Sequence, residues 1–140
     1  MVQNKVEVQT PKPMMNQDTV KFWELLQEKK QLHLQRCADC ETYSHPPRVT
    51  CHKCRSFNME WVPSEGKGEV HSYVVYHRSV HPGFEVPYEV ILVELEEGVR
   101  IVSNMVDCKP EEVYIGMPVE HVVEQTFEDI SLVKFKRQTT

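Results

Sequence analysis

The chain has 140 residues, 40% apolar residues and a formal net charge of −5 at pH 7. This length suits one medium domain or two small ones, and no apolar run approaches the roughly 18 residues that span a membrane. The acidic balance argues against a protein built to grip phosphate backbones. Five cysteines without a recognisable export signal favour a reducing cytoplasm.

The N-terminal part predicts a tail followed by one helix. Residues 1–16 carry two prolines and no sustained periodicity, so we expect a flexible tail there. Residues 17–30 predict an amphipathic helix, with Asp18 or Thr19 as its cap. Its apolar stripe includes Phe22 and Trp23. The stripe either packs on the protein's own core or docks a partner, and the sequence leaves both open.

Residues 17–62 are expected to form one unit, in which the helix is followed by a segment with two C-x-x-C pairs. Cys37 and Cys40 form the first pair, and Cys51 and Cys54 form the second. Ten residues lie between the two pairs. Two facing pairs supply the four thiolates of a closed tetrahedral site, which structural Zn²⁺ prefers. Two disulfides would suit a secreted protein, and a redox dithiol would need only one pair beside a βαβ pattern. The spacing therefore predicts one structural zinc ion per chain.

Three further residues near these motifs have simpler interpretations. His45 and His52 lie close to the cysteines, but four thiolates already complete the site, so we expect both imidazoles to be bystanders. Cys108 has no partner cysteine and no activating base in its neighbourhood. We expect a half-buried thiol without a catalytic role.

Residues 63–140 predict an all-β domain. Five strand-like runs lie near residues 69–77, 88–95, 99–106, 118–125 and 130–137, with turn residues between them. Five short antiparallel strands favour a small barrel of the OB type, which leaves few exposed edges, and a sandwich fragment is the alternative. The expected fold class is thus mainly β: an N-terminal helix, a zinc ribbon and a five-stranded OB-fold barrel.

An ordered set of motifs carries a family resemblance. The motifs are Phe22-Trp23, Gln35-Arg36-Cys37, Pro46-Pro47-Arg48, Trp61, Gly66-x-Gly68, Pro87-Tyr88, Glu96-Glu97-Gly98, Ser103-Asn104 and Ile115-Gly116-Met117-Pro118-Val119. The chain from about residue 18 onward resembles the acyl-CoA-associated OB-fold family with an N-terminal rubredoxin-like zinc ribbon, formerly a domain of unknown function. It departs from that family at Glu41, where glycine is frequent, and at His52, where proline is common.

This resemblance implies a non-catalytic accessory or scaffold subunit. Members of the family associate with thiolase-fold enzymes, such as thiolases, acyltransferases and steroid side-chain aldolases, or with hydratases of the hot-dog fold. The OB domain is thought to help bind or channel an acyl-CoA. Besides the helix residues Phe22 and Trp23, the candidate ligand or partner contacts are Phe84, which would stack on an adenine or cover a pantetheine arm, and Arg78 and Arg100, which would meet phosphates.

Two other functions stay open at this point. Zinc ribbons and OB folds both occur in nucleic-acid-binding modules, and the basic run at residues 134–137 surrounds an aromatic residue. An independent acyl-CoA enzyme would need an acid–base group, and His71, His77 and His81 are its candidates. His71 and His77 are expected on one face of the first barrel strand. No nucleophile–base pairing is evident beside them.

Overall fold

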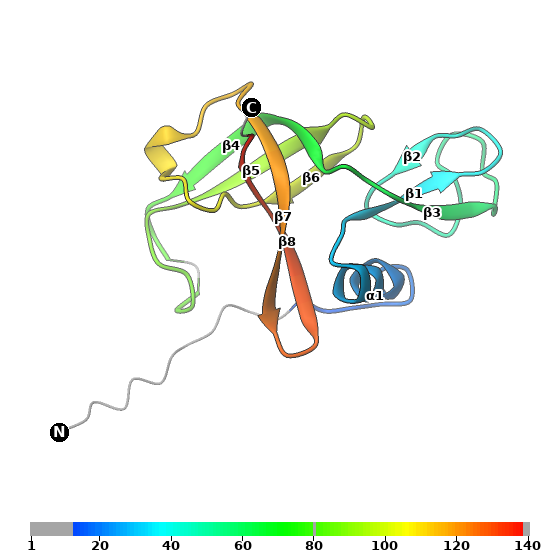
Figure 1. Ribbon diagram of the computed structural model, residues 1–140, viewed down its shortest axis with the longest axis horizontal. Coiled ribbons are helices and arrows are strands. Elements are labelled where there is room, and N and C mark those ends of the chain that lie inside the picture. Colours follow the sequence, from blue (N-terminus) through cyan, green and yellow to red (C-terminus); the bar gives the residue numbers. More distant parts are fainter. Residues whose placement is uncertain (1–12, 80, 139–140) are drawn as a thin grey trace.

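The structure, a computed structural model, describes residues 13–79 and 81–138 (Figure 1). Most of the predicted tail, residues 1–12, therefore lies outside the described residues. The elements in chain order are α1 (Val20–Lys29), β1 (His33–Cys37), β2 (Tyr43–Ser44), β3 (Met59–Pro63), β4 (Lys67–Tyr76), β5 (Tyr88–Leu95), β6 (Arg100–Ser103), the 3₁₀ turn η1 (Pro110–Glu112), β7 (Pro118–Phe127) and β8 (Ile130–Arg137).

Helix α1 begins later than predicted, and an asparagine side chain holds the turn that precedes it. Thr19 occupies the N-cap position but makes no side-chain capping bond there. Instead the Asn16 side-chain oxygen accepts the backbone N–H groups of Asp18 and Thr19, at 2.9 and 3.0 Å. Asparagine favours such local turns because its short carboxamide reaches backbone donors two or three residues on. Thr19 is thus the N-cap residue, one of the two predicted, but its side chain makes no capping bond.

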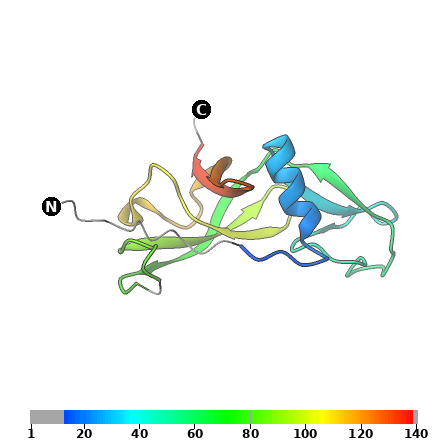
Figure 2. The same ribbon diagram turned by 90° about the horizontal axis from the view of Figure 1, so that it is seen from below.

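The apolar stripe of α1 packs on the chain's own core. Phe22, Leu25 and Leu26 are buried, and the helix lies between the three-stranded ribbon and the barrel in both views (Figures 1 and 2). Polar contacts add to this packing, because Lys30 at the C-terminal end of α1 donates to the Ser131 hydroxyl at 2.7 Å. Burial of these side chains shows that self-packing holds the stripe.

The ribbon is an antiparallel sheet in the order β2-β1-β3. Strand β1 pairs with β3 from His33 opposite Pro63 to Cys37 opposite Met59. Leu32 and Leu34 are buried in the core, and His33 between them is half-buried, as expected for side chains on opposite faces of a strand. Tyr43 of β2 and Trp61 of β3 also pack against this core, so all three strands anchor the ribbon to the rest of the protein.

The second sheet has five antiparallel strands in the order β6-β5-β4-β7-β8. Its two edge strands meet, because Met105 forms a parallel bridge with Phe135 just after β6 ends. Two hydrogen bonds fix this closure: Val106 N–H donates to the Phe135 carbonyl at 2.8 Å, and Phe135 N–H donates to the Asn104 carbonyl at 3.0 Å. A nearly closed five-stranded barrel confirms the OB-fold prediction.

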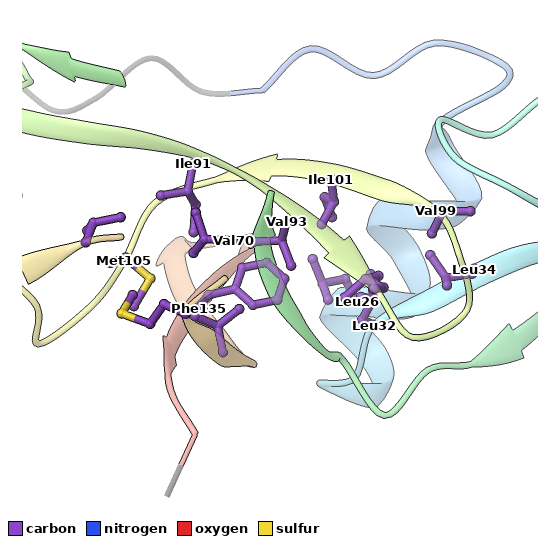
Figure 3. Packing of buried hydrophobic residues seen from close by; sticks show 14 of the residues in the cluster. Leu26, Leu32, Leu34, Val70, Ile91, Val93, Val99, Ile101, Met105 and Phe135 are labelled. Atoms are coloured by element: carbon purple, nitrogen blue, oxygen red, sulfur yellow. The ribbon is translucent and has the colours of Figure 1, made fainter. Parts of the chain in front are cut away.

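One hydrophobic core joins the helix, the ribbon and the barrel. Phe135 and Val93 fill the barrel, and Leu26, Leu32 and Leu34 continue the same cluster toward α1 and β1 (Figure 3). Because the cluster is continuous, the ribbon and the barrel do not have separate hydrophobic interiors. The orientation of one relative to the other is fixed by shared side-chain packing.

Candidate metal centre and ligand groove

Four cysteine side chains converge at the tip of the ribbon. The Sγ atoms of Cys37, Cys40, Cys51 and Cys54 all lie within 4.8 Å of one another. Cys37 and Cys54 sulfurs are 3.5 Å apart, as are those of Cys40 and Cys51. A tetrahedral site with zinc–sulfur bonds of about 2.3 Å sets its sulfurs about 3.8 Å apart. The donor set and its spacing therefore fit a closed four-thiolate metal site.

Backbone N–H groups point at two of these sulfurs. Cys40 N–H donates to Cys37 Sγ at 3.4 Å, and the N–H groups of Lys53 and Cys54 donate to Cys51 Sγ at 3.3 and 3.5 Å. Such donors stabilise a thiolate over a thiol. A metal ligand must be a thiolate, so the backbone of each C-x-x-C turn prepares its first cysteine for binding.

The pKa values of the cysteines differ within the cluster. The side-chain and backbone hydrogen bonds of Thr42 lower the pKa of Cys40 to about 6. The backbone N–H of Ser56 lowers the pKa of Cys54, but the sulfurs of Cys40 and Cys37 outweigh it and raise that pKa to about 12. Four thiolates cannot share this small volume without a cation, because like charges repel. The cluster thus requires a bound metal ion at neutral pH if all four are to ionise.

Each turn of the cluster ends in a strained residue. Glu41 follows the first pair and Arg55 follows the second, and both have φ of 65°. This left-handed conformation favours glycine, since a side chain there crowds the following carbonyl. Glu41 is the position where the related family often has glycine, and an ion pair of 2.9 Å with Arg36 holds its carboxylate. This chain therefore places a side chain at position 41, where glycine would avoid the steric strain.

A mostly apolar groove of about 320 Å³ opens where α1, the ribbon loop, β6 and β8 meet. Phe22 and Trp23 contribute from the helix, and Pro46 and Pro47 from the loop between the cysteine pairs. The other lining residues come mainly from the two strands and the helix start: Thr19, His45, Ile101, Val102, Ser103, Asn104, Leu132, Val133 and Lys134. An apolar groove with a few polar groups at its rim is the usual form of a small-molecule site.

A second hollow, of about 380 Å³, adjoins this groove and shares His45 with it. It lies between the ribbon and the β5–β6 turn, and Arg48, His52 and Arg100 supply its cationic or titratable groups. Glu94 is the one acidic residue among those that line it, and its carboxylate is 3.4 Å from the Arg100 side chain. The hollow therefore presents two guanidinium groups beside an apolar groove.

The predicted contacts Arg78 and Phe84 lie at the opposite end of the barrel. Tyr88 pairs with Tyr76 at the start of β5, whereas Glu94 pairs with Arg100 near its end. Six residues of strand separate these positions, which is about 20 Å. Arg78 follows β4 at the first end, so Arg78 and Arg100 cannot hold one phosphate together. Phe84 stacks on Tyr88, with ring centres 5.1 Å apart.

The histidines of the barrel do not form a catalytic arrangement in the described residues. A bulge in β4 between Val70 and Ser72 shifts the alternation, so that Val70 and Tyr73 both contact the core. His71 and His77 therefore do not share a face, contrary to the prediction. The His81 ring accepts the backbone N–H of Gly83 at 2.9 Å and is thus engaged in its own turn.

One serine–histidine pair does exist in the ribbon. Ser44 Oγ lies 3.0 Å from His52 Nδ1. Ser44, however, is only 2% exposed, and the hydrogen bonds of the described residues give the His52 ring no carboxylate partner. A nucleophile must meet its substrate and its base must be oriented by a third group. The pair lacks both properties and is better described as part of the ribbon's packing.

The basic run at the C-terminus is neutralised by neighbouring acids. Lys134 pairs with Glu124 at 3.1 Å, and Arg137 lies 3.8 Å from Glu112. The aromatic residue of the run, Phe135, is fully buried in the barrel. A buried ring cannot stack on a base, so this segment lacks the features of a single-strand-binding surface.

Cys108 is half-buried and lies outside the four-cysteine cluster. Burial raises the pKa of its thiol. A raised pKa disfavours the nucleophilic thiolate.

Comparison with known proteins identifies both parts of the chain. Residues 31–60 match the family model for the rubredoxin-like zinc ribbon domain of ChsH2, and residues 61–124 match the model for its C-terminal OB-fold domain. A "DUF35 domain-containing scaffold protein" of Methanocaldococcus jannaschii is 45% identical over 114 residues, which are 79% of each chain. This chain belongs to the ChsH2/DUF35 family.

Solved structures of the family agree with the fold. A chain of the "Ltp2-ChsH2(DUF35) aldolase" is 41% identical and superposes with a TM-score of 0.82, covering 90% of this chain and 98% of that one. A DUF35 protein of unknown function from Sulfolobus solfataricus is 15% identical and superposes with a TM-score of 0.58. At this low identity the likeness concerns the fold and not the function.

Other relatives of this DUF35 chain are longer proteins. It is 44% identical over 117 residues to a "Probable enoyl-CoA hydratase alpha subunit" of Thermomonospora curvata, and 40% identical over 108 residues to the "3-oxo-4,17-pregnadiene-20-carboxyl-CoA hydratase alpha subunit" of Mycobacterium tuberculosis. The matched regions span 36% and 34% of those proteins.

No helix within the described residues has the length and apolar character needed to cross a membrane.

The groove is the part of the site that sequence reasoning missed. Phe22 and Trp23 were candidates, and both line it, but Arg48, Val102 and Leu132 were not. Alternation within β6 and β8 marks which residues face inward or outward. It cannot show that two strands, a helix and a ribbon loop meet at one place, because that depends on tertiary packing.

Proposed function

We propose that this chain is a non-catalytic accessory subunit that binds and scaffolds a thiolase-fold or hydratase-type enzyme acting on acyl-CoA. The main support is the match over 98% of a chain named as part of an aldolase. Hydratase alpha subunits that contain a similar segment support it further. The described residues also lack an exposed nucleophile paired with an oriented base, which an independent enzyme of this type would need. In this function the zinc ion holds the ribbon in place and takes no part in chemistry, because four thiolates leave no open coordination position.

We further propose that this chain binds the acyl-CoA directly. The apolar groove beside Phe22 and Trp23 would hold the acyl or pantetheine portion, and Arg48 and Arg100 in the adjoining hollow would meet the phosphates. The two sites share His45, so one extended ligand would fill both. An amphipathic ligand with an anionic end matches this arrangement better than a purely apolar one.

Affinity purification tests the scaffold role. The tagged full-length chain is isolated from its native cells, and the bound proteins are identified by mass. Near-stoichiometric recovery of a thiolase-fold or hydratase-type enzyme is the expected result. Recovery of the chain alone, repeated at low salt, would contradict the scaffold role, because weak electrostatic contacts survive at low ionic strength.

Ligand binding tests the acyl-CoA site separately. Octanoyl-CoA is titrated into the purified chain by calorimetry, with CoA and free octanoate as the two partial ligands. We expect octanoyl-CoA to bind most tightly, Trp23→Phe to alter the heat, and Arg100→Gln to weaken binding about tenfold, since charge-assisted hydrogen bonds to phosphate are lost. Arg78→Gln is the matched control, because this arginine lies at the other end of the barrel. Equal loss in both arginine variants would refute the assignment of the phosphate position.

A further inference from the structure

Strand β4 has an open edge along its second half. It pairs with β5 over residues 68–76 but with β7 only over residues 67–69. The Val70 N–H donates to the Met117 carbonyl, and the Val70 carbonyl accepts the N–H of Gly116. Beyond Val70, β4 has no further backbone partner on this edge among the described residues. Figure 1 shows this end of β4 extending away from β7.

The register of β5 shows which backbone groups of β4 face the open edge. Leu95 N–H donates to the carbonyl of Val99, which precedes β6. Antiparallel bonding alternates along a strand, so the odd-numbered residues of β5 bond β6 and the even-numbered ones bond β4. The β4 residues opposite those even positions are Ser72, Val74 and Tyr76. The N–H and C=O groups of Tyr73 and Val75 therefore point to the open edge.

The open segment lacks the features that normally prevent pairing between edges. Residues 71–77 read HSYVVYH and contain no proline, lysine or carboxylate. Natural edge strands are usually very short, or are protected by proline or by charged side chains. Here Val74 is 53% exposed and Tyr76 is 38% exposed. An uncharged, apolar edge of this kind favours pairing with another extended strand.

The open segment, residues 72–76, is centred on Val74, which makes it complementary to a second copy of itself. In an antiparallel pair of two copies, Tyr73 of each chain lies opposite Val75 of the other, and each of these pairs exchanges two N–H···O bonds. The two Val74 side chains then meet at the two-fold axis, at the close spacing of a non-hydrogen-bonded pair. The backbone groups left open in one copy are thus satisfied by the same groups of the other.

Charges at the two ends of the segment are complementary in the same register. Arg78 follows one end and Glu69 precedes the other, and both are exposed. Because residue 71 is the extra residue of the β4 bulge, Arg78 of one copy falls opposite Glu69 of the other. Neither side chain has an ion pair among the described residues. Glu94, which lies opposite Glu69 in the same chain, is already paired with Arg100.

We propose that two copies of this chain pair through the open edge of β4, in the antiparallel register centred on Val74. The pairing joins the two barrel sheets into one continuous sheet and brings Arg78 against Glu69 at both ends. The net charge of −5 on each copy opposes association at long range, but physiological salt screens it beyond about 8 Å. A strand of an unrelated protein would match the backbone groups without this twofold charge match.

The dimer leaves the other sites of the chain accessible. The ribbon and α1, which border the apolar groove, lie at the far end of the molecule from the open edge (Figure 1). A pair of chains would therefore present two grooves and two metal ribbons, one at each end. The inference goes beyond the proposed function and does not depend on it.

Sedimentation velocity of the purified full-length chain tests the dimer. A strand pair of this length buries less area than a standard interface, so we expect reversible dimerisation with a Kd of roughly 1–100 µM. Loading concentrations from about 1 to 300 µM cover this range. A chain that stays monomeric throughout would refute the proposal.

A proline at position 75 tests the assigned edge. Val75→Pro removes one N–H that points to the open edge and leaves the bonds to β5 in place, an orientation in which edge strands tolerate proline. We expect Kd to rise about tenfold or more. Ile115→Glu is the control, because this residue is 67% exposed and lies in the connector between η1 and β7. Zinc content and melting temperature establish that each variant is folded, and an unchanged Kd in folded Val75→Pro would assign the dimer to another surface.

A charge-reversal cycle tests the register without relying on proline. Arg78→Glu and Glu69→Arg each place like charges opposite one another at both ends, so we expect each to raise Kd about tenfold. The double variant restores opposite charges, and its Kd should return to within about threefold of the wild-type value. Single variants that dimerise normally, or a double variant that is not rescued, would contradict the register.

Two other occupants of the edge would be recognised in the same measurements. A wild-type monomer that dimerises once residues 1–12 are deleted would assign the edge to the N-terminal segment. A monomer whose capture of an acyl-CoA enzyme is lost in Val75→Pro would assign the edge to a strand of that enzyme. Either result overturns the proposal. Affinity purification of the enzyme by the wild-type chain tests the proposed function separately, because it does not require a dimer.

Discussion

Met105 and Phe135 pair in a parallel bridge that joins the two edges of the barrel, and the Phe135 ring is 0% exposed. Phe135→Ala should therefore lower the free energy of unfolding by about 3–5 kcal/mol, because it leaves a large cavity at the point of closure. Urea denaturation followed by circular dichroism measures this change. Phe57→Ala is the control: that ring is 76% exposed, so we expect a change within about 0.5 kcal/mol. Comparable losses in the two variants would contradict the assigned core.

The four-cysteine cluster predicts that loss of one cysteine removes the metal, and Cys108 offers a matched cysteine control. Cys37→Ser should abolish stoichiometric zinc and lower the melting temperature by roughly 10 °C or more, since metal binding contributes directly to the folding free energy of small zinc modules. Cys108→Ser should keep both values, because Cys108 lies outside the cluster. Elemental analysis and thermal melts provide the two readouts. Retention of zinc and normal melting in Cys37→Ser would refute the four-cysteine site.

The strained turns of the ribbon predict stabilising substitutions. Arg55→Gly should raise stability by about 1 kcal/mol, because glycine adopts the left-handed conformation without steric cost. Glu41→Gly should gain less, since it also loses the exposed ion pair with Arg36. Arg55→Ala keeps the strain and serves as the control. If Arg55→Gly is no more stable than Arg55→Ala in denaturant melts, the strain does not contribute.

Two glycines are expected to differ in how strongly alanine destabilises the protein. A Cβ atom at Gly68 would lie 2.2 Å from the Glu94 carbonyl oxygen, a backbone atom that cannot move without disrupting β5. Gly68→Ala should therefore cost about 2–3 kcal/mol or more. Gly98 has φ of 94° but open space around it, so Gly98→Ala should cost only its backbone strain, about 1–2 kcal/mol. The order of the two melting temperatures checks the close approach.

Burial lowers the pKa of His45 below its ordinary value of 6.5. The unfolded state then binds more protons than the folded state, so stability is complete above about pH 6.5 and falls as the pH drops toward the folded pKa. His45→Phe keeps a ring against Phe22, whose centre lies 5.4 Å from that of His45, and removes the titration. We expect a smaller loss of urea midpoint between pH 7.5 and 5.5 in this variant. An unchanged pH slope would contradict a buried neutral imidazole.

The strands and the metal site are the parts that the sequence predicts best. Strand β5 begins and ends at the predicted Tyr88 and Leu95, and β8 spans the predicted 130–137. The third predicted barrel strand, 99–106, is longer than β6, which ends at Ser103 because the chain then leaves β5 to pair with Phe135. Local alternation specifies which residues face the core. It does not specify where a strand changes its partner.

Features that depend on distant contacts escaped prediction. The bulge at His71 depends on the pairing of β4 with β5 and has no glycine or proline to mark it. Whether the stripe at Phe22 packs internally also depends on tertiary contacts, since the helix has the same pattern in either case. The apolar run in β5 resembles that of any buried strand, so the sequence does not show that alternate side chains of β5 are only half-buried.

The loop between the two cysteine pairs also forms a wall of the groove, through Pro46 and Pro47. Metal binding and ligand binding in the groove would therefore share one structural element. Such linkage is reciprocal: a ligand in the groove should tighten zinc binding by the same free energy with which zinc tightens binding of the ligand. The ion would then act as an effector of a site to which it contributes no ligand atom.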